Sequence, residues 1–192
     1  MPDFGPDVWS YAVLAVTLLV AAATDVRRGK IYNWITYPAA LIGLAGHAIT
    51  GGLWGSPERL GLAGALGGLL VGFGPLLLAW LAGGIGGGDA KIMAAVGALT
   101  GWQFALSALF YGLAVAMVMA VAIMLRKRIV RDTFGRIWRF FLLWAGRAKP
   151  DAPTTQQSPT VPFGLALCIG AAVTLTLTCI FGPSDKLFLL GI

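Results

Sequence analysis

Six apolar segments constrain the fold of this chain more than any other feature of its sequence. A helix needs about 20 mostly apolar residues to cross the hydrocarbon core of a bilayer. Five of the segments come close to that length, and the fourth is shorter. We therefore predict an all-α, polytopic membrane protein with six transmembrane helices, at residues 8–25, 34–50, 60–82, 89–102, 104–125 and 161–181.

The composition supports a membrane protein rather than a soluble one. Hydrophobic residues make up 58% of the chain and charged residues 11%, whereas soluble domains carry about 25% charged residues. The length favours a single membrane domain over residues 1–192. Cys168 and Cys179 stand too far apart on one helix for a disulfide, and no Cys/His cluster suggests a metal, so we expect no metal and no cofactor.

Two of the apolar segments carry glycines that bear on packing. The fourth segment is too short to span the membrane alone, so either the run Gly83–Gly88 completes it or it lies where the bilayer is locally thin. The third segment places Gly64, Gly68 and Gly72 on one ridge. Such a ridge lets helices approach closely, which predicts packing within the monomer and leaves dimerisation open. The oligomeric state is not predicted.

The distribution of Lys and Arg predicts the orientation. With the N-terminus and the C-terminus outside the cytoplasm, the outer segments hold only Arg59 and Lys186 of the 14 basic residues. The segment 126–147 mixes cations with large apolar residues and predicts an amphipathic helix on the cytoplasmic surface, followed by a polar linker at 148–160. Lipid phosphates account for the net charge of +6. We therefore expect membrane lipids as partners and no nucleic acid.

Two of the eight acidic residues lie at the cytoplasmic ends of apolar helices. Asp25 stands at the exit of the first helix, in AAATDVRRGKIYNW, and Asp89 at the entry of the fourth, in GGIGGGDAKIM. This topology puts both at the same membrane depth, so neighbouring helices would bring the carboxyls face to face. Ionisable residues at such depth are costly and point to function. We therefore predict an aspartyl dyad in which one carboxyl is ionised and the other keeps a proton.

Each residue of this region also has a structural interpretation. Asp89 fits the N-cap of the fourth helix, and Asp25 fits a solvated charge paired with a neighbouring arginine, although a helix C-terminus disfavours a carboxylate. The glycines 86–88 would let a substrate backbone come close and permit positive φ, or form a flexible loop. Lys91 would either steady the charge of Asp89 or bind a lipid phosphate.

These motifs resemble those of type IV prepilin peptidases. Gly86, Gly87, Gly88 and Asp89 fit the GxGD signature, which this family shares with presenilin-like intramembrane aspartyl proteases. The segment 25–33 fits the family's first aspartate, basic loop and Asn, with Tyr32 where a proline is usual. Pro162-Phe163-Gly164 resembles the family's Pro-Tyr/Phe-Gly element, which we interpret as close helix packing near the site without a chemical role.

The resemblance implies an aspartic endopeptidase of the cell inner membrane that removes the basic leader from prepilins at the cytoplasmic face, typically after a glycine and without a metal. It implies Asp25 and Asp89 as the catalytic residues. Residues that bind substrate or support the site would be Gly86, Gly87, Gly88, Lys91, Lys30 and Asn33. Larger members also N-methylate the new terminus and carry an insert with paired CxxC motifs. This sequence has no such pair, so it resembles the short form associated with Flp-type tight-adherence pili.

Two other classes of function remain open at this point. Paired carboxylates and helices broken by Gly or Pro also occur in small transporters and proton-coupled carriers. A non-catalytic subunit of a pilus or secretion assembly is the second alternative. His47, near the outer end of the second segment, is expected to be a packed or interface-facing histidine rather than a ligand. It lies on the wrong side to serve the two aspartates.

Overall fold

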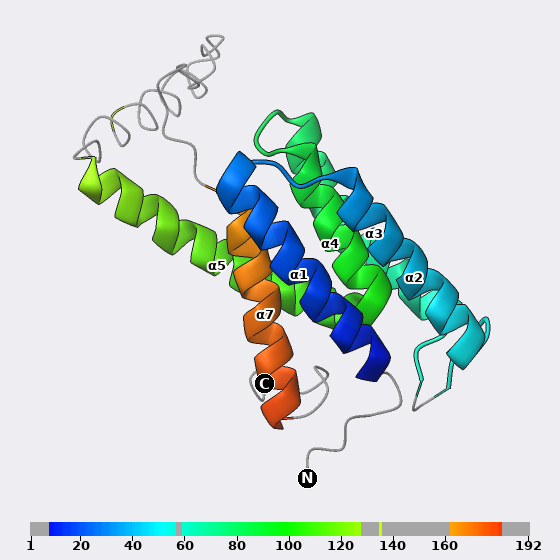
Figure 1. Ribbon diagram of the computed structural model, residues 1–192. Coiled ribbons are helices and arrows are strands. Elements are labelled where there is room, and N and C mark those ends of the chain that lie inside the picture. The colour runs from blue at the N-terminus through cyan, green and yellow to red at the C-terminus, as the bar shows by residue number, and fades with distance from the viewer. Residues whose placement is uncertain (1–7, 57–58, 128–134, 136–161, 182–192) are drawn as a thin grey trace. The chain divides into compact units, whose positions relative to one another are not determined.

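The computed structural model describes residues 8–56, 59–127, 135 and 162–181. Regular secondary structure in these ranges is helical (Figure 1), as the sequence predicts. The predicted amphipathic helix at 126–147 and the linker at 148–160 lie outside the described residues, apart from 126, 127 and 135. The helices are α1 Val8–Arg28, α2 Asn33–Gly51, α3 Leu62–Leu81, α4 Gly87–Thr100, α5 Trp102–Arg126 and α7 Phe163–Phe181.

The chain divides into two compact units. The first comprises Met1–Ala116 and Pro162–Ile192, and the second comprises Met117–Val161. Helix α5 begins in the first unit and ends in the second. The first unit contains α1 to α4 and α7, and it holds both aspartates, so the site belongs to this unit alone.

Within the described residues, four helices are long and apolar enough to cross a membrane: α1, α3, α5 and α7. The other two predicted spans correspond to α2 and α4. Helix α2 carries polar residues such as Asn33, Thr36 and His47, which lowers its hydropathy. Helix α4 has 14 residues, or about 21 Å at 1.5 Å per residue, which is shorter than the hydrocarbon core.

Helix α4 is the centre of the first unit. It packs most closely on α3 and α2, and it also contacts α1 and α7. Because neighbouring helices cover it on several sides, much of this short helix is buried within the protein. Its buried residues are Ala90, Ile92, Met93, Ala95, Val96, Gly97, Ala98 and Leu99.

Glycines allow the close approach of α3 to α4. A Cβ added at Gly68 would stand 2.7 Å from Gly101 Cα and would overlap the Gly97 carbonyl, and one added at Gly72 would overlap the Met93 carbonyl. The predicted packing of the glycine ridge within the monomer is therefore confirmed for these two positions. Gly64 differs, because its nearest neighbour is the Leu60 side chain.

Candidate active site

Asp25 lies in the last turn of α1 and is 7% exposed. The helix ends three residues later, where the φ of +61° at Gly29 turns the chain. The Gly29 N–H donates to the Asp25 carbonyl oxygen at 2.7 Å, which closes the last turn. Arg27 and Arg28 follow on the exposed surface, so the carboxyl points inward while its cationic neighbours point outward.

Asp89 lies in the first turn of α4 and is half-buried. The interpretation of Asp89 as the N-cap is wrong, because the N-cap of α4 is Gly86, and the Asp89 N–H donates to the Gly86 carbonyl at 3.2 Å. One carboxyl oxygen, Oδ2, faces Gly86, where an added Cβ would stand 3.3 Å away. The other oxygen, Oδ1, is therefore available to face a neighbouring helix.

The carboxyls of Asp25 and Asp89 meet at Gly164, near the start of α7. A Cβ added at Gly164 would stand 3.0 Å from Asp25 Oδ2 and 3.0 Å from Asp89 Oδ1. The two oxygens are therefore separated by no more than twice that distance. The sequence-based topology places both residues at one membrane depth, and the structure adds that their side chains converge on one point.

The N-terminus of α7 supplies a hydrogen bond to this pair. The backbone N–H of Leu165 donates to Asp25 Oδ2 at 2.7 Å. The sequence did not identify Leu165, because every residue except proline carries the same backbone N–H donor. The signal that points to it is Pro162-Phe163-Gly164, which opens the helix and brings its first free N–H groups next to the aspartates.

Lys91 and Asn33 form a contact that the sequence did not predict. Lys91 Nζ donates to Asn33 Oδ1 at 2.9 Å, and the ammonium group lies 5.4 Å from the centre of the Tyr37 ring. Since Lys91 is on α4 and the other two residues are on α2, the contact ties the aspartate-bearing turn of α4 to the start of α2. It involves neither of the two partners that the sequence suggested for Lys91.

Lys30 lies in the exposed segment between α1 and α2. In the same segment Arg28 Nη1 donates to the Tyr32 hydroxyl at 3.2 Å, and the Arg28 guanidinium lies 5.8 Å from the centre of that ring. Tyr32, which stands where the resembling family usually has proline, is also the N-cap residue of α2. It therefore joins the end of α1 to the start of α2.

The glycines before Asp89 accommodate neighbouring parts of the protein. A Cβ added at Gly87 would stand 3.2 Å from the Trp80 Nε1, and one added at Gly88 would stand 3.2 Å from the Ile31 carbonyl. Glycines 86–88 do not use the positive φ that they permit, whereas Gly83, where the chain leaves α3, has φ +76°. Gly86 alone of the three is exposed.

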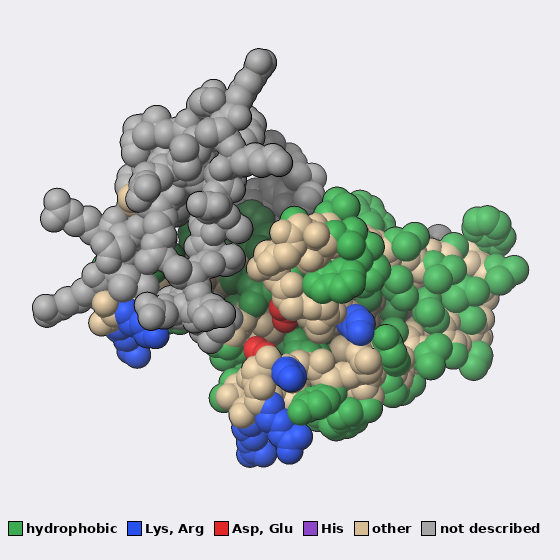
Figure 2. Space-filling model, turned by 90° about the horizontal axis from the view of Figure 1, so that it is seen from above, with side chains coloured by type: hydrophobic (Ala, Val, Ile, Leu, Met, Phe, Trp, Pro, Cys, Tyr) green, Lys and Arg blue, Asp and Glu red, His purple; other side chains and the backbone are tan. Residues whose placement is uncertain are grey.

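The dyad is visible from outside the protein. Asp25 and Asp89 are the acidic residues among those described, so the acidic surface in Figure 2 belongs to them. It appears between the helix ends, with basic side chains beside it. The site is thus a recessed pair of carboxyls open at one end of the helices, with basic side chains on part of its border.

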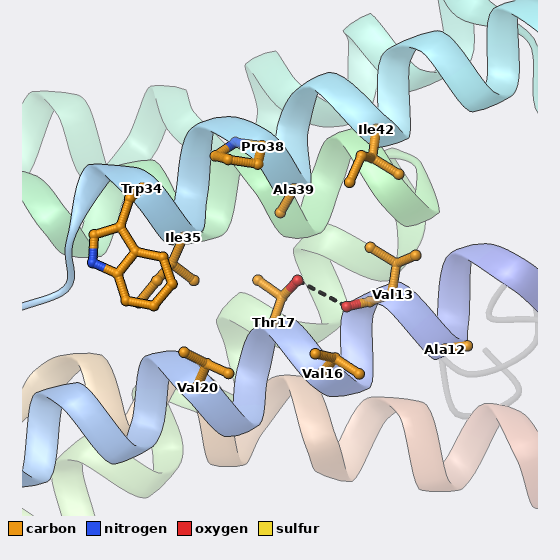
Figure 3. Close-up of a pocket in the computed structure, with 10 residues that line it drawn as sticks. All are labelled: Ala12, Val13, Val16, Thr17, Val20, Trp34, Ile35, Pro38, Ala39 and Ile42. Atoms are coloured by element: carbon orange, nitrogen blue, oxygen red, sulfur yellow. Dashed lines mark hydrogen bonds between the residues drawn. The ribbon is translucent and has the colours of Figure 1, made fainter.

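A pocket of about 430 Å³ lies elsewhere, between α1 and α2 (Figure 3). Its one described hydrogen bond between lining residues runs from Thr17 Oγ1 to the Val13 carbonyl at 2.8 Å. It contains neither aspartate and no other titratable side chain, so acid–base chemistry belongs to the dyad and not to this pocket. The lining residues are Ala12, Val13, Val16, Thr17, Val20, Trp34, Ile35, Pro38, Ala39 and Ile42.

His47 is a packed side chain, as predicted. It is 1% exposed, its Nε2 lies 2.8 Å from the Leu99 carbonyl oxygen, and its ring lies 4.9 Å from that of Trp9. A carbonyl accepts, so Nε2 carries the proton in this contact. In the part of the chain that the structure describes, no cluster of three or more His, Cys, Asp or Glu side chains has the arrangement of a metal site.

Comparison with known proteins gives a family model and curated relatives that describe the same kind of enzyme. Residues 12–123 match the model of the type IV leader peptidase family. The chain is also 31% identical over 183 residues to the prepilin leader peptidase/N-methyltransferase of two strains of Burkholderia pseudomallei, 1026b and K96243. The alignment covers 90% of this chain and 48% of each relative, so the chain spans about half the length of these curated relatives. No solved structure matches the chain at a significant level.

Proposed function

The chain belongs to the type IV leader peptidase family, and we propose that it is an aspartic endopeptidase that removes the leader peptide from type IV prepilins. One observation carries the proposal: the carboxyls of Asp25 and Asp89, from helices far apart in the sequence, converge at Gly164. The family is of the aspartic type, and that chemistry requires two adjacent carboxyls.

The two carboxyls supply a base and an acid to one water molecule. Two nearby carboxyls do not both ionise cheaply, so one retains a proton at working pH. The ionised carboxyl takes a proton from water, whose oxygen attacks the scissile carbonyl carbon, while the protonated carboxyl donates to the carbonyl oxygen. Collapse of the resulting intermediate breaks the C–N bond, and the amine leaves with a proton.

The surroundings of the dyad suit a substrate whose basic leader precedes an apolar helix. The apolar helix would lie in the membrane, and the cleaved bond would lie at its cytoplasmic boundary. There the backbone must be extended to reach the carboxyls, and the exposed Gly86 leaves room for it to pass. Other residues support the site in three ways. Gly87 and Gly88 allow close packing, and the bond between Lys91 and Asn33 links α4 to α2. Lys30 contributes positive charge.

We place the dyad at the cytoplasmic side of the cell inner membrane. Arg27, Arg28, Lys30 and Lys91 lie at the end of the helices that carries the aspartates, and Arg59 lies between α2 and α3 at the other end. An excess of cations marks the cytoplasmic side. In this arrangement α2 and α4 cross with the four apolar helices as one membrane domain, both termini lie outside, and anionic lipids contact the basic residues at the end that carries the aspartates.

Within the family we propose a short-form peptidase that serves Flp-type tight-adherence pili. The proposal covers leader removal and does not extend to the methyltransferase activity in the name of the Burkholderia relatives. Its partners are a prepilin or pseudopilin and the surrounding lipids.

Leader removal tests the proposal directly. Membranes that contain this chain and a recombinant type IV prepilin with a basic leader would be assayed by gel shift for the wild type, Asp25→Asn and Asp89→Asn. Asparagine keeps the side-chain shape and removes the ionisation. Asp151→Asn, in the predicted linker, is the matched control. We expect cleavage by the wild type and the control, and loss of at least about a thousandfold in each dyad variant.

The competing functions give different results in the same membranes. A proton-coupled carrier would lose flux in the dyad variants while the prepilin stays uncut in every sample. An assembly subunit would support pilus formation with both aspartates replaced. Cleavage at near wild-type rate by either dyad variant, at equal protein levels, would falsify the two-aspartate mechanism.

A further inference from the structure

The dyad needs one ionised and one protonated carboxyl. The surroundings of Asp25 and Asp89 differ in a way that indicates which of the two is ionised. Helix dipoles alone do not decide, because each aspartate lies beside the positive end of a helix. Asp89 is in the first turn of α4, and Asp25 lies against the first turn of α7. Asp25 also lies at the C-terminal end of α1, where the backbone carbonyls disfavour negative charge.

The hydrogen bond from Leu165 distinguishes the two carboxyls. The Leu165 N–H is the third of α7, so it has no partner within the helix, and it donates to Asp25 Oδ2 at 2.7 Å. An N–H group donates and never accepts, and hydrogen bonds of this kind favour the charged form of a carboxyl. Asp25 is 7% exposed, so water competes little with this donor.

The position of the accepting oxygen adds a second argument. Asp25 Oδ2, which accepts from Leu165, is also the oxygen that lies beside Asp89 Oδ1 at Gly164. A carboxyl oxygen that carries a proton is a poor acceptor. A proton on Asp25 Oδ2 would therefore weaken the Leu165 bond, whereas a proton on Asp89 leaves that bond intact.

Among the residues that the structure describes, few other titratable groups face Asp25. From the helices packed on α1, the groups close to its carboxyl are Asp89 on α4 and Cys168 on α7. Other cations and titratable groups of these elements have different partners or are exposed. Lys91 bonds Asn33, Arg28 bonds Tyr32, and His47 bonds the Leu99 carbonyl. The Tyr37 ring contacts Lys91, and the side chains of Arg27 and Lys30 are exposed.

We infer that the backbone N–H of Leu165 holds Asp25 as the ionised base that activates water, so that Asp89 is the acid that keeps the shared proton. The inference rests on the proposed function. Asp25 takes the proton of the attacking water and later passes it to the leaving amine. Asp89 donates its proton to the carbonyl oxygen and recovers it when the intermediate collapses. Leu165 is a positioning residue that acts through Asp25.

Leu165→Pro removes this donor with little other change. Proline is tolerated in the first turn of a helix, because the N–H groups there have no helical partner. The residue before it is Gly164, which has no Cβ and so removes part of the clash between a proline ring and the preceding residue. Leu165→Ala is the matched control, since it shortens the same side chain and keeps the N–H. A backbone ester at 165, introduced as the α-hydroxy acid of leucine, removes the N–H without any ring.

The readout is the pH dependence of prepilin cleavage in membranes, normalised to the amount of enzyme. The dyad titrates as a pair, and its activity falls at low pH when the base is protonated and at high pH when the acid loses its proton. A hydrogen bond to a charged group corresponds to about one to two pH units. We expect Leu165→Pro and the ester to shift the acid limb of the pH profile to higher pH by about one to two units. The alkaline limb should stay where it is, and Leu165→Ala should have the profile of the wild type.

The remaining outcomes separate this inference from the proposed function. A shift of the alkaline limb would make Asp25 the acid and overturn the inference. An equal loss of rate at every pH would show a structural role for Leu165 and would also overturn it. Both results leave the peptidase assignment intact. If the wild type cleaves no prepilin at any pH, the proposed function itself fails, and the inference fails with it.

Discussion

Asp25 and Leu165 are 140 positions apart in the sequence, and the backbone N–H of Leu165 donates to the Asp25 carboxyl at 2.7 Å. This bond explains how an acid is tolerated at the C-terminal end of α1, where the helix dipole opposes it. The positive end of α7 lies against the same carboxyl and offsets that cost. The two helices thus form one electrostatic unit around the aspartate.

Gly164→Ala is expected to slow cleavage by up to about a hundredfold. The added methyl group would stand 3.0 Å from one oxygen of each carboxyl and 2.7 Å from Ile31 Cδ1, so these side chains must give way by a few tenths of an ångström. Displacement of catalytic groups by about 1 Å costs on the order of a hundredfold in rate. The check is the gel-shift assay, with Gly67→Ala as the control, because nothing lies within 4 Å of a Cβ at that position. Cleavage by Gly164→Ala at the wild-type rate would contradict the convergence of the carboxyls.

Gly68→Ala is expected to destabilise the protein, while Gly67→Ala is not. A methyl group at Gly68 would overlap the Gly97 carbonyl of α4, whereas one at Gly67 meets open space. Overpacking of a tight interface typically costs about 1–3 kcal/mol. Thermal unfolding in detergent compares the two neighbouring variants under identical conditions. Equal midpoints would mean that α3 and α4 do not pack through this glycine.

Much of the fold follows from the sequence, because apolar runs and helix ends are local properties. The first predicted span, 8–25, corresponds to α1 at Val8–Arg28, and the fourth, 89–102, to α4 at Gly87–Thr100. The prediction that Asp25 and Asp89 lie at the same end of their helices follows from counting crossings, and the carboxyls do meet at Gly164. The Leu165 bond and the link from Lys91 to Asn33 depend on how distant helices pack, and no local pattern encodes that.

His47→Leu is expected to destabilise the first unit far from the dyad. His47 Nε2 donates to the carbonyl of Leu99, near the C-terminal end of α4, where helix carbonyls lack partners. Loss of a buried partner costs about 1–3 kcal/mol. His47→Gln keeps a donor and should recover part of that loss, as measured by thermal unfolding. Full stability of His47→Leu would show that the Leu99 carbonyl finds another donor.

Lys91 and Asn33 are expected to affect the rate of cleavage through the one hydrogen bond that joins them. Lys91 Nζ donates to Asn33 Oδ1 at 2.9 Å and so ties the turn that carries Asp89 to the start of α2. Lys91→Met keeps the length of the side chain without the donor, and Asn33→Ala removes the acceptor. Since either change breaks the same bond, the double variant should cleave at nearly the rate of the slower single variant, with a coupling of about two- to tenfold.

Cleavage rates of the four proteins, measured at equal enzyme levels, decide whether this coupling exists. If Lys91 acted through lipid phosphate instead, the losses in the two single variants would multiply in the double variant. The effect of Lys91→Met would then depend on the anionic lipid content of the vesicles. A bond within the protein predicts the same coupling in neutral and anionic vesicles, because its partners stay fixed while the surrounding charge changes.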